Sequence, residues 1–322
     1  MLARAFWTVA GGRGEVRGET LSVPGPDEVL VEAKWSAVSR GTESLVFNGR
    51  VPKSEFLRMR CPFQVGDFPA PVKYGYASVG RVDAGPPELR GRKVFCLHPH
   101  QTAYVVPADA VVLVPDAVSP ERAVLAANME TAVNALWDGA PRPGDRVSVV
   151  GAGVVGSLVA YLARHVAAVD VELVDRRDER IEIARTFGTS FATPENARVE
   201  RDLVFHASGT REGLRTALSL AGYEGVVVEL SWFGDVEPSV PLGAAFHSRR
   251  LTLRGSQVGG LSPNARARFT RRSRLELAVS LCSEAALDVL FSGDSTLDEL
   301  PEAMVRLASP DSGALCHRVR YG

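Results

Sequence analysis

The segment GAGVVG, residues 151–156, constrains the fold more than any other feature of this chain. It follows the apolar run RVSVV and opens the helical pattern SLVAYLARHV, so it lies at a strand-to-helix turn inside a βαβ unit. Gly151 permits the tight turn, Gly153 lets a pyrophosphate approach the backbone, and Gly156 allows helix and strand to pack closely. The helix N-terminus, with the N–H groups of Val154 and Val155, then faces the phosphates. This pattern predicts a dinucleotide-binding site.

The residues after Arg146 alternate between short apolar runs and helical patterns. Strands are predicted in VSVVG, VDVELVD, DLVFHAS and GVVVELS, and helices in SLVAYLARHV, RRDERIEIARTFG and REGLRTALSLA. Apolar strands that alternate with helices are typical of a parallel sheet covered on both faces. We therefore expect a doubly wound α/β domain in this part of the chain.

The second predicted strand ends at Asp175, nineteen residues after Gly156. A carboxylate at this place accepts hydrogen bonds from the ribose hydroxyls of NAD and repels the 2′-phosphate of NADP. Arg176 and Arg177 follow, and they either hold such a phosphate or begin a solvated helix beside acidic neighbours. NAD is therefore the expected cofactor, with NADP as the open alternative. Further cofactor contacts are predicted at Thr131, Arg176, Arg180 and Ser208.

The first hundred residues are rich in predicted strands. In EVLVEAKWSAV, residues 28–38, the apolar side chains and Trp35 fall on one face, while Glu32, Lys34 and Ser36 fall on the other. This period of two is typical of a half-buried strand. Further strands are predicted at Val72–Val82, Lys93–Leu97, Thr102–Val106 and Ala110–Val114, with a long surface loop at Asn48–Pro71 between them.

Helical patterns flank the alternating region. Ser119-Pro120-Glu121 predicts a helix start and Gly139 its end. After Gly260 the sequence predicts a basic helix (Pro263–Cys282), a short strand, a helix (Leu297–Leu307) and the terminal strand ALCHRVRY. The predicted fold class is α/β with two domains. Residues 129–264 form the dinucleotide-binding domain, and residues 1–128 with 265–322 form a β-rich substrate domain.

Composition excludes several partners. The chain has 37 Lys and Arg against 38 Asp and Glu, and this net charge of −1 disfavours nucleic acid and anionic membranes as partners. Four well-separated cysteines without a C-x-x-C pair indicate reduced thiols and no cysteine-built zinc site. The first residues lack the apolar core of a signal peptide, and glycines interrupt the longest uncharged run. We expect a cytoplasmic protein without a membrane span.

Four segments carry a resemblance to a known family: PGPDEVLVEAKWSAVSRGTE, VKYGYASVGRV, VVPADAVVLVPDAVSPERAVL and FHSRRLTLRGSQVG. Together they resemble the medium-chain dehydrogenase/reductase superfamily over nearly the whole chain. The S-x-G-T-E loop is most similar to the branch that contains 3-hydroxyethyl bacteriochlorophyllide dehydrogenase and relatives named zinc-type alcohol dehydrogenases. The resemblance implies a GroES-like substrate domain, a Rossmann cofactor domain and an NAD(P)-dependent oxidoreductase. It also implies a homodimer, paired through the edge strand Leu251–Gly255.

The catalytic zinc ligands of this superfamily are replaced in the resemblance. Arg40 stands at the first ligand position and Tyr76 at the histidine. Ala127 falls near the third, with Glu130 as the nearest donor, and the four-cysteine structural lobe is missing. Zinc needs sulfur, imidazole or carboxylate ligands, and the fixed charge of Arg40 opposes a divalent cation. We therefore expect neither zinc nor another metal.

Without a metal, side-chain donors must stabilise the oxygen that becomes negative during hydride transfer. By resemblance, Thr42 stands at a hydroxyl proton relay, and the two histidines of FCLHPHQTAY stand near the substrate wall. Each candidate has a structural alternative, since Arg40 could pair with Glu43, the Thr42 hydroxyl could cap its loop, and His-Pro-His could only shape a turn. The predicted catalytic residues are Arg40, Thr42, Tyr76, His98 and His100.

Two basic segments have open interpretations. For Arg266, Arg268, Arg271, Arg272 and Arg274 a solvated helix face is favoured over an anion site. The loop that contains Arg58 and Arg60, with phenylalanines nearby, is a hypothetical pocket wall for an acidic or ring-bearing substrate.

The leading functional hypothesis is a zinc-independent, NAD(P)-dependent oxidoreductase that interconverts a secondary alcohol and a ketone on a small-molecule substrate. The first alternative is a reductase of an activated C=C bond, which needs the same donors. The second alternative is a regulatory protein that binds the nucleotide without turnover.

Overall fold

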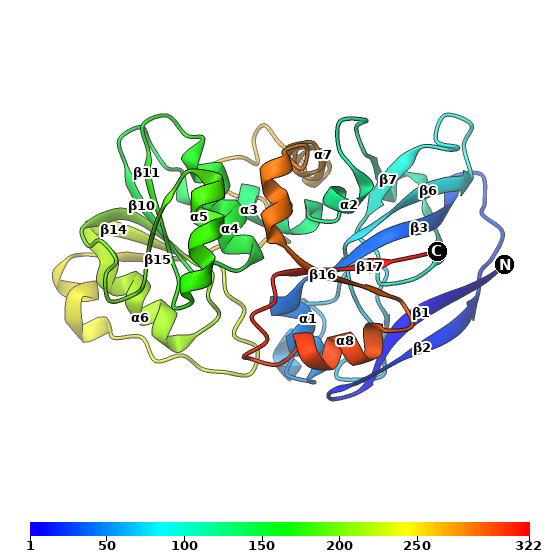
Figure 1. Ribbon diagram of the computed structural model, residues 1–322, viewed down its shortest axis with the longest axis horizontal. Helices are drawn as coiled ribbons and strands as arrows, with labels where there is room; N and C mark the ends of the chain where they lie inside the picture. The colour runs from blue at the N-terminus through cyan, green and yellow to red at the C-terminus, as the bar shows by residue number, and fades with distance from the viewer. The chain divides into compact units, whose positions relative to one another are not determined.

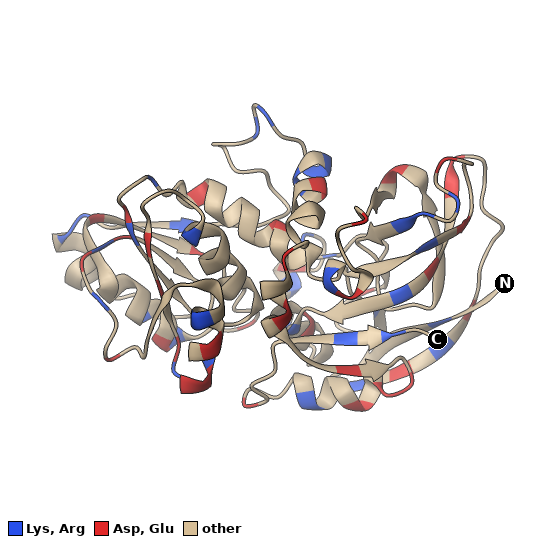
Figure 2. Ribbon diagram, turned by 45° about the horizontal axis from the view of Figure 1, so that its top comes forward, with Lys and Arg blue, Asp and Glu red and all other residues tan.

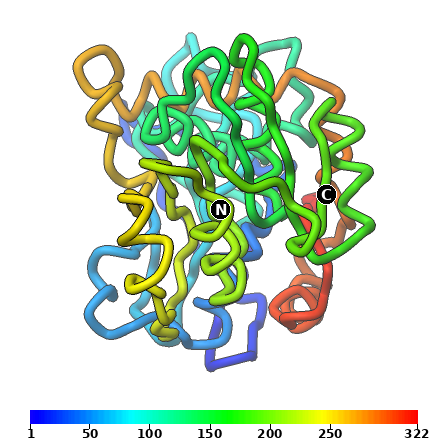
Figure 3. The backbone as a smooth tube through the Cα atoms, turned by 90° about the vertical axis from the view of Figure 1, so that its left-hand side faces the viewer, coloured from blue at the N-terminus to red at the C-terminus, as the bar shows by residue number.

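The computed structural model describes residues 1–322, and the chain divides into two compact units. The first unit comprises residues 1–127 and 275–322, and the second comprises residues 128–274. Figure 3 traces the chain from blue at its start to red at its end, and these two ends of the chain belong to the same unit. The Arg274 side chain, at the end of the second unit, is buried among residues of that unit. No helix is long and apolar enough to cross a membrane.

The first unit is built on two sheets (Figure 1). The smaller sheet has the strand order β2-β1-β5-β4 and comprises β1 (Leu2–Ala10), β2 (Arg13–Thr20), β4 (Val65–Gly66) and β5 (Val72–Lys73). The larger sheet has the order β16-β17-β3-β6-β7-β9, with β8 paired to β3. Its strands are β3 (Glu28–Val38), β6 (Ser78–Ala84), β7 (Lys93–Cys96), β8 (Ala103–Pro107), β9 (Val111–Leu113), β16 (Phe291–Thr296) and β17 (Cys316–Arg320). Its helices are α1 (Arg40–Phe47), α2 (Pro120–Ala123) and α8 (Leu300–Leu307), with short turns at Lys53–Glu55, Ala108–Ala110 and Ala285–Leu290.

Strand β3 departs from simple alternation at its centre. Its pairing with β6 shifts register between Ala33 and Trp35, so one extra residue is inserted there. An inserted residue breaks the strict alternation of inward and outward side chains. Ser36, predicted to face outward, is buried together with Ala37 and Val38, whereas Trp35, predicted to face inward, is half-exposed. This irregularity brings a hydroxyl into the interior of the unit.

The run Val72–Val82, predicted as one strand, is two strands in different sheets. Residues 72–73 form β5 and residues 78–84 form β6, so the connecting residues 74–77 carry no strand pairing. Tyr76 lies in this connection. The preceding segment 48–71, predicted as a surface loop, is partly anchored in the interior by Phe68, whose ring packs 5.7 Å from those of Phe56 and Tyr74.

The second unit contains one six-stranded parallel sheet with the order β12-β11-β10-β13-β14-β15. The chain winds outward from β10 in one direction and from β13 in the other. Right-handed crossovers therefore place α4 and α6 on opposite faces of the sheet. The strands are β10 (Arg146–Val150), β11 (Asp170–Val174), β12 (Ser190–Ala192), β13 (Arg201–His206), β14 (Ala221–Glu229) and β15 (Thr252–Gly255). The helices are α3 (Ala126–Gly139), α4 (Val154–Arg164), α5 (Ile181–Phe187) and α6 (Arg211–Leu220), with shorter turns at Asp178–Arg180 and Leu242–Phe246. Helix α7 (Arg271–Leu281) begins in this unit and continues into the first.

The predicted α/β class with Rossmann and GroES-like parts is confirmed, while several helix boundaries differ. The single helix predicted from residue 119 to 139 is two helices, α2 and α3. The helix predicted at residues 176–188 begins as a 3₁₀ turn at Asp178 and ends at Gly188, which adopts the left-handed conformation. The basic helix predicted at Pro263–Cys282 starts only at Arg271.

Arg274 corrects the interpretation of the basic segment as a wholly solvated face. Its side chain is only 2% exposed and donates to Glu130 Oε1 at 3.0 Å and to Asn134 Oδ1 at 2.6 Å. Burial raises the pKa of the Glu130 carboxyl, and the Arg274 charge opposes that rise. Basic positions, coloured blue, are interspersed with acidic positions, coloured red, along both units (Figure 2). Arg274 is therefore an internal crosslink between α7 and α3.

We expect the substitution Arg274→Met to lower the free energy of unfolding by about 3–5 kcal/mol, because it leaves the Glu130 carboxylate buried without its partner. The double variant Arg274→Met, Glu130→Met should recover much of that loss. The matched control is exposed Arg272→Met on the same helix, which should change stability by about 0.5 kcal/mol or less. Urea denaturation measures all three, and equal effects at positions 272 and 274 would contradict the crosslink.

Candidate active site

The three glycines of the turn have three different surroundings. Gly151 has φ +107°, and a Cβ there would lie 2.6 Å from the backbone N of Ser208. A Cβ on Gly156 would lie 1.9 Å from the carbonyl oxygen of Gly151. Gly153 is exposed and a Cβ on it would meet nothing within 4 Å. Gly151 and Gly156 are therefore required by the fold, whereas Gly153 leaves open space beside the backbone.

The open side of the turn is the N-terminus of α4. Gly153 is its N-cap and supplies no side chain to bond the first N–H groups. Val154 and Val155, which follow, are half-buried. The first turn therefore offers backbone donors and the positive end of the helix dipole to an anion.

Asp175 lies beside this turn at the carboxyl end of β11. Its two oxygens accept hydrogen bonds from the N–H groups of Ala152 at 2.7 Å and Arg177 at 2.9 Å. These bonds hold the carboxylate in place and leave further lone pairs on both oxygens. Arg176 is exposed, whereas Arg180 is buried and its pKa is lowered by desolvation.

Ser208 is held against the turn by a buried polar chain that the sequence did not indicate. Its Oγ lies 2.6 Å from His206 Nε2, and His206 Nδ1 lies 2.7 Å from Glu229 Oε2. A Cβ on Gly213 would lie 2.0 Å from the Ser208 Oγ, so the hydroxyl is enclosed by the first turn of α6. The structure thus groups Asp175 and Ser208 with the glycine turn. Thr131, the remaining predicted contact, is half-buried on α3.

In the first unit, a group of hydroxyls surrounds Tyr76. The side chains of Ser39 and Thr42, at the start of α1, lie near enough to the Tyr76 hydroxyl to lower the pKa of its phenol. Burial raises the pKa of this phenol well above its usual value, and the nearby Glu43 carboxylate raises it further. The structure thus brings together two predicted residues, Tyr76 and Thr42, and adds Ser39. Tyr76 is a neutral hydrogen-bond donor at ordinary pH.

A second polar chain begins at Glu43, which the sequence analysis treated only as a partner for Arg40. Glu43 Oε1 accepts a hydrogen bond from the Ser39 N–H at 2.7 Å, and Oε2 lies 2.9 Å from His100 Nε2. His100 Nδ1 lies 2.7 Å from Ser36 Oγ, which lies 2.8 Å from the Tyr321 hydroxyl. The sequence signal for Glu43 is weak, because it lies four residues after the N-cap Ser39, one residue beyond the spacing at which a glutamate completes a capping box. Because His100 is 1% exposed, it contacts this chain rather than an open pocket.

His98 has different surroundings from His100. Its ring stacks 3.7 Å from that of Tyr104 and 5.6 Å from that of Phe63. Burial lowers the pKa of His98 to about 3, so its imidazole is neutral at pH 7. His98 and His100, two of the predicted catalytic residues, are thus close in sequence but have separate sets of contacts.

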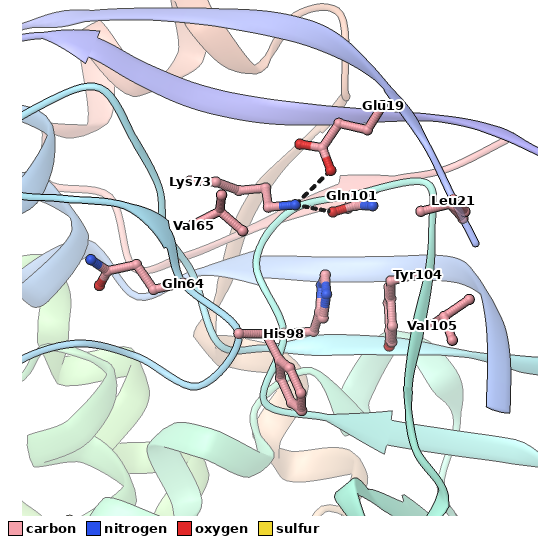
Figure 4. A pocket seen from close by; sticks show the side chains of 10 residues that line it. Glu19, Leu21, Gln64, Val65, Lys73, His98, Gln101, Tyr104 and Val105 are labelled. Atoms are coloured by element: carbon pink, nitrogen blue, oxygen red, sulfur yellow. Dashed lines mark hydrogen bonds and ion pairs between the residues drawn. The ribbon is translucent and has the colours of Figure 1, made fainter. Parts of the chain in front are cut away.

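His98 lines a pocket of about 270 Å³ within the first unit (Figure 4). Two charged groups line this pocket, the ammonium of Lys73 and the carboxylate of Glu19, and Lys73 Nζ is 2.7 Å from both Glu19 Oε2 and Gln101 Oε1. The Gln101 amide in turn donates to the Ala103 carbonyl. The buried polar side chains of this pocket are therefore largely satisfied by one another.

The positions that resemble zinc ligands hold side chains of another chemistry. They are the guanidinium of Arg40, which donates to Ser312 Oγ at 3.3 Å, the phenol of Tyr76 and the methyl group of Ala127. All four cysteines are buried, and burial raises the pKa of each thiol to about 12. The structure contains no group of three or more His, Cys, Asp and Glu side chains placed to hold a metal ion.

Comparison with known proteins gives dehydrogenases and reductases, although no family model matches the chain. The chain is 30% identical over 169 residues to a protein of Arthroderma otae named Probable D-xylulose reductase A, a match that covers 48% of this chain and 47% of that protein. The chain thus spans about half the length of this relative. It is 24% identical to D-guloside 3-dehydrogenase of Escherichia coli K12 over 89% of this chain and 88% of that one.

Solved structures match the chain from end to end. L-idonate 5-dehydrogenase of Escherichia coli K-12 has a TM-score of 0.82 at 17% identity, covering 100% of this chain and 99% of that one. A protein of Escherichia coli CFT073 described as a short chain alcohol dehydrogenase, complexed with the cofactor NADH, has a TM-score of 0.78 at 17% identity, and the match covers 99% of each chain. The chain therefore has the same fold as these two dehydrogenases. The predicted resemblance is thereby confirmed at the level of the fold.

Substitutions at Gly156 and Gly153 should cause different defects. Gly156→Ala should lower the thermal midpoint and abolish NADH binding, since its Cβ would collide with the Gly151 carbonyl. Gly153→Ala should keep the midpoint, because its Cβ enters open space, yet weaken NADH binding about tenfold or more by blocking the approach of the pyrophosphate. Thermal denaturation and NADH fluorescence titration separate these effects. Wild-type affinity in folded Gly153→Ala would place the nucleotide elsewhere.

Proposed function

We propose that this chain is a zinc-independent, NAD(P)-dependent dehydrogenase that interconverts a secondary alcohol and a ketone. The observation that carries the proposal is the hydroxyl cluster of Tyr76, Ser39 and Thr42, which lies where the resemblance places the zinc and its proton relay. The names of the sequence relatives, a reductase of D-xylulose and a dehydrogenase of a guloside, favour C=O over C=C chemistry.

The residues of the second unit fit a nicotinamide dinucleotide. The free N–H groups of α4 and the open space at Gly153 suit a pyrophosphate, and the fixed carboxylate of Asp175 suits ribose hydroxyls. The same carboxylate would repel a 2′-phosphate, which favours NAD over NADP. Exposed Arg176 is the residue that would accommodate NADP. When bound, the nicotinamide supplies or accepts the hydride.

The hydroxyl cluster of the first unit would manage the proton. If the Ser39 and Thr42 hydroxyls donate to the Tyr76 oxygen, the Tyr76 hydrogen is left for the substrate oxygen. In the direction of reduction, the carbonyl carbon gains a hydride and its oxygen gains the Tyr76 proton. The Tyr76 oxygen regains a proton from the hydroxyl of Thr42 or Ser39, which is replenished from water. Oxidation reverses each transfer.

Zinc does not fit the residues at the resembling positions. A guanidinium, a phenol and a methyl group offer at most one oxygen ligand, and Arg40 adds a positive charge. We therefore assign the stabilisation of the substrate oxygen to hydrogen-bond donors.

A homodimer belongs to the same proposal. Strand β15 is the edge of the parallel sheet, and its four residues are exposed. An exposed strand edge offers unpaired backbone groups to a second copy of the chain.

Replacing Tyr76 by Phe should lower kcat for ketone reduction about a hundredfold or more, because the donor to the substrate oxygen is lost. NADH affinity should not change. The matched control is Tyr74→Phe, whose hydroxyl donates to the Met59 carbonyl and whose ring lies beside that of Tyr76. Stopped-flow and steady-state assays with NADH and a panel of ketones and ketoses measure both variants. Undiminished turnover in Tyr76→Phe would refute the assigned role.

Metal analysis tests the other half of the proposal. Protein purified without chelators should contain far less than one zinc per chain, and 1,10-phenanthroline should leave ketone reduction unchanged. Elemental analysis by mass spectrometry gives the metal content. One tightly bound zinc whose removal abolishes turnover would overturn zinc independence.

A further inference from the structure

The pocket of about 270 Å³ in the first unit has one polar atom whose hydrogen-bonding capacity is unused. His98 is 5% exposed, and its Nδ1 lies 3.0 Å from the carbonyl oxygen of Pro99. A carbonyl oxygen only accepts, so Nδ1 carries the hydrogen of this bond. Burial lowers the pKa of His98 to about 3, so the ring holds a single hydrogen at neutral pH. The other ring nitrogen, Nε2, is therefore a lone-pair acceptor.

The Nε2 atom of His98 opens into the pocket rather than into the packed interior. It has no hydrogen-bond partner in the protein, since the ring bonds only through Nδ1. Three polar side-chain atoms of the protein are fully enclosed without a partner, and His98 Nε2 is not one of them. Solvent therefore reaches this nitrogen. Because Phe63 and Tyr104 stack on the ring and His98 lines the pocket, the accessible edge of the ring is the one that borders the pocket.

The two charges that line the pocket compensate each other. The Lys73 ammonium lies 2.7 Å from Glu19 Oε2 and also 2.7 Å from Gln101 Oε1. In Figure 4 the side chains of Lys73 and Gln101 lie above the ring of His98. With His98 neutral, the lining combines one cation, one anion and a free acceptor. The pocket therefore offers a hydrogen-bond acceptor without a net charge.

The remainder of the lining is apolar and limits the size of a ligand. Beside the polar groups stand Leu21, Phe63, Val65 and Val105. Small-molecule sites usually measure about 300–1,000 Å³ and combine apolar walls with a few polar groups. At about 270 Å³, this pocket suits a molecule with a single ring.

The free acceptor and the balanced charge select the polar group of the ligand. A hydroxyl donates its hydrogen to a lone pair such as that of His98 Nε2, and the lone pairs of its oxygen suit the Lys73 ammonium nearby. A carboxylate has no hydrogen to donate at neutral pH, and it would lie near the carboxylate of Glu19. An alkylammonium would lie near Lys73.

We propose that this pocket is a binding site for a neutral alcohol with one apolar ring, whose hydroxyl donates to His98 Nε2. The lining includes neither Tyr76 nor Thr42, so the alcohol binds at a place that the hydroxyl cluster does not line. The site goes beyond the proposed dehydrogenase activity, because it lies within the first unit and needs no cofactor.

Cyclohexanol is the probe, added to the full chain without cofactor. In protein labelled with ¹⁵N at its six histidines, the Nε2 signal of His98 is the one absent from His98→Phe. Cyclohexanol should move this signal with saturation in the millimolar range, since a ligand of this size gains little binding free energy. Cyclohexanecarboxylate and cyclohexylammonium should bind about tenfold or more weakly, because neither fits both the acceptor and the charges.

Three variants locate the bound probe, with saturation-transfer NMR of cyclohexanol as the measure of affinity. His98→Phe keeps a ring against Phe63 and Tyr104 but removes the acceptor, so affinity should fall about tenfold. Leu21→Trp fills the pocket and should abolish saturable binding. Tyr104→Phe is the matched control, because its hydroxyl is bonded to Ser78 Oγ at 3.1 Å, and affinity should not change.

The inference is overturned if either His98→Phe or Leu21→Trp binds cyclohexanol as tightly as the wild type, or if the His98 signal does not move. Tighter binding of the carboxylate than of cyclohexanol would overturn the neutral class. Should His98→Phe fail to fold, the loss of binding in Leu21→Trp decides. Tyr76→Phe should keep wild-type cyclohexanol affinity whatever its effect on turnover, so a failure of this site and a failure of the proposed function are distinguishable.

Discussion

The second unit depends on a contact that no side chain could occupy. Gly156 on α4 lies so close to the Gly151 carbonyl that a Cβ would be placed 1.9 Å from that oxygen. The contact draws the first turn of α4 onto the end of β10, while Gly151 at φ +107° turns the backbone beneath Ser208. Because α4 begins at this place, its unpaired N–H groups open beside Asp175 at the end of β11. The anion-binding geometry therefore follows from backbone packing rather than from any charged side chain.

The first unit depends on an irregularity of a different kind. The register shift in β3 between Ala33 and Trp35 interrupts the alternation of the strand, and Ser36 beyond it is buried. The Ser36 hydroxyl is the group that His100 Nδ1 meets at 2.7 Å and the Tyr321 hydroxyl at 2.8 Å. The polar chain to Glu43 is thus set by one inserted residue in a sheet.

These two cases show what could be predicted from the sequence. The glycine spacing and the alternation of apolar runs determine the parallel sheet directly, since both are local patterns with few structural solutions. Asp175 and Ser208 were predictable because they follow strands that end at one edge. Helix boundaries were harder to predict from the sequence. Helix α7, for example, begins only close to Arg274, which makes buried contacts with Glu130 and Asn134. Strict alternation in β3 predicts that Ser36 faces outward. This prediction is wrong because a bulge leaves no signature in residue types. Nor does spacing separate His98 from His100, whose partners come from strands and helices distant in sequence.

The molecule contains two hydrogen-bonded chains of polar side chains, one in each unit, and both must satisfy a buried histidine. Each places a buried histidine between a carboxylate and a hydroxyl, through His206 in the second unit and His100 in the first. In the second unit the hydrogen-bonded chain ends at Ser208, whose Oγ also lies 3.0 Å from the Thr210 hydroxyl just before α6. In the first unit its carboxylate, Glu43, accepts a hydrogen bond from the Ser39 N–H just before α1. The same arrangement therefore fixes the chain next to a helix start in both units. The two cases differ in the group that does so, a hydroxyl in the second unit and a carboxylate in the first.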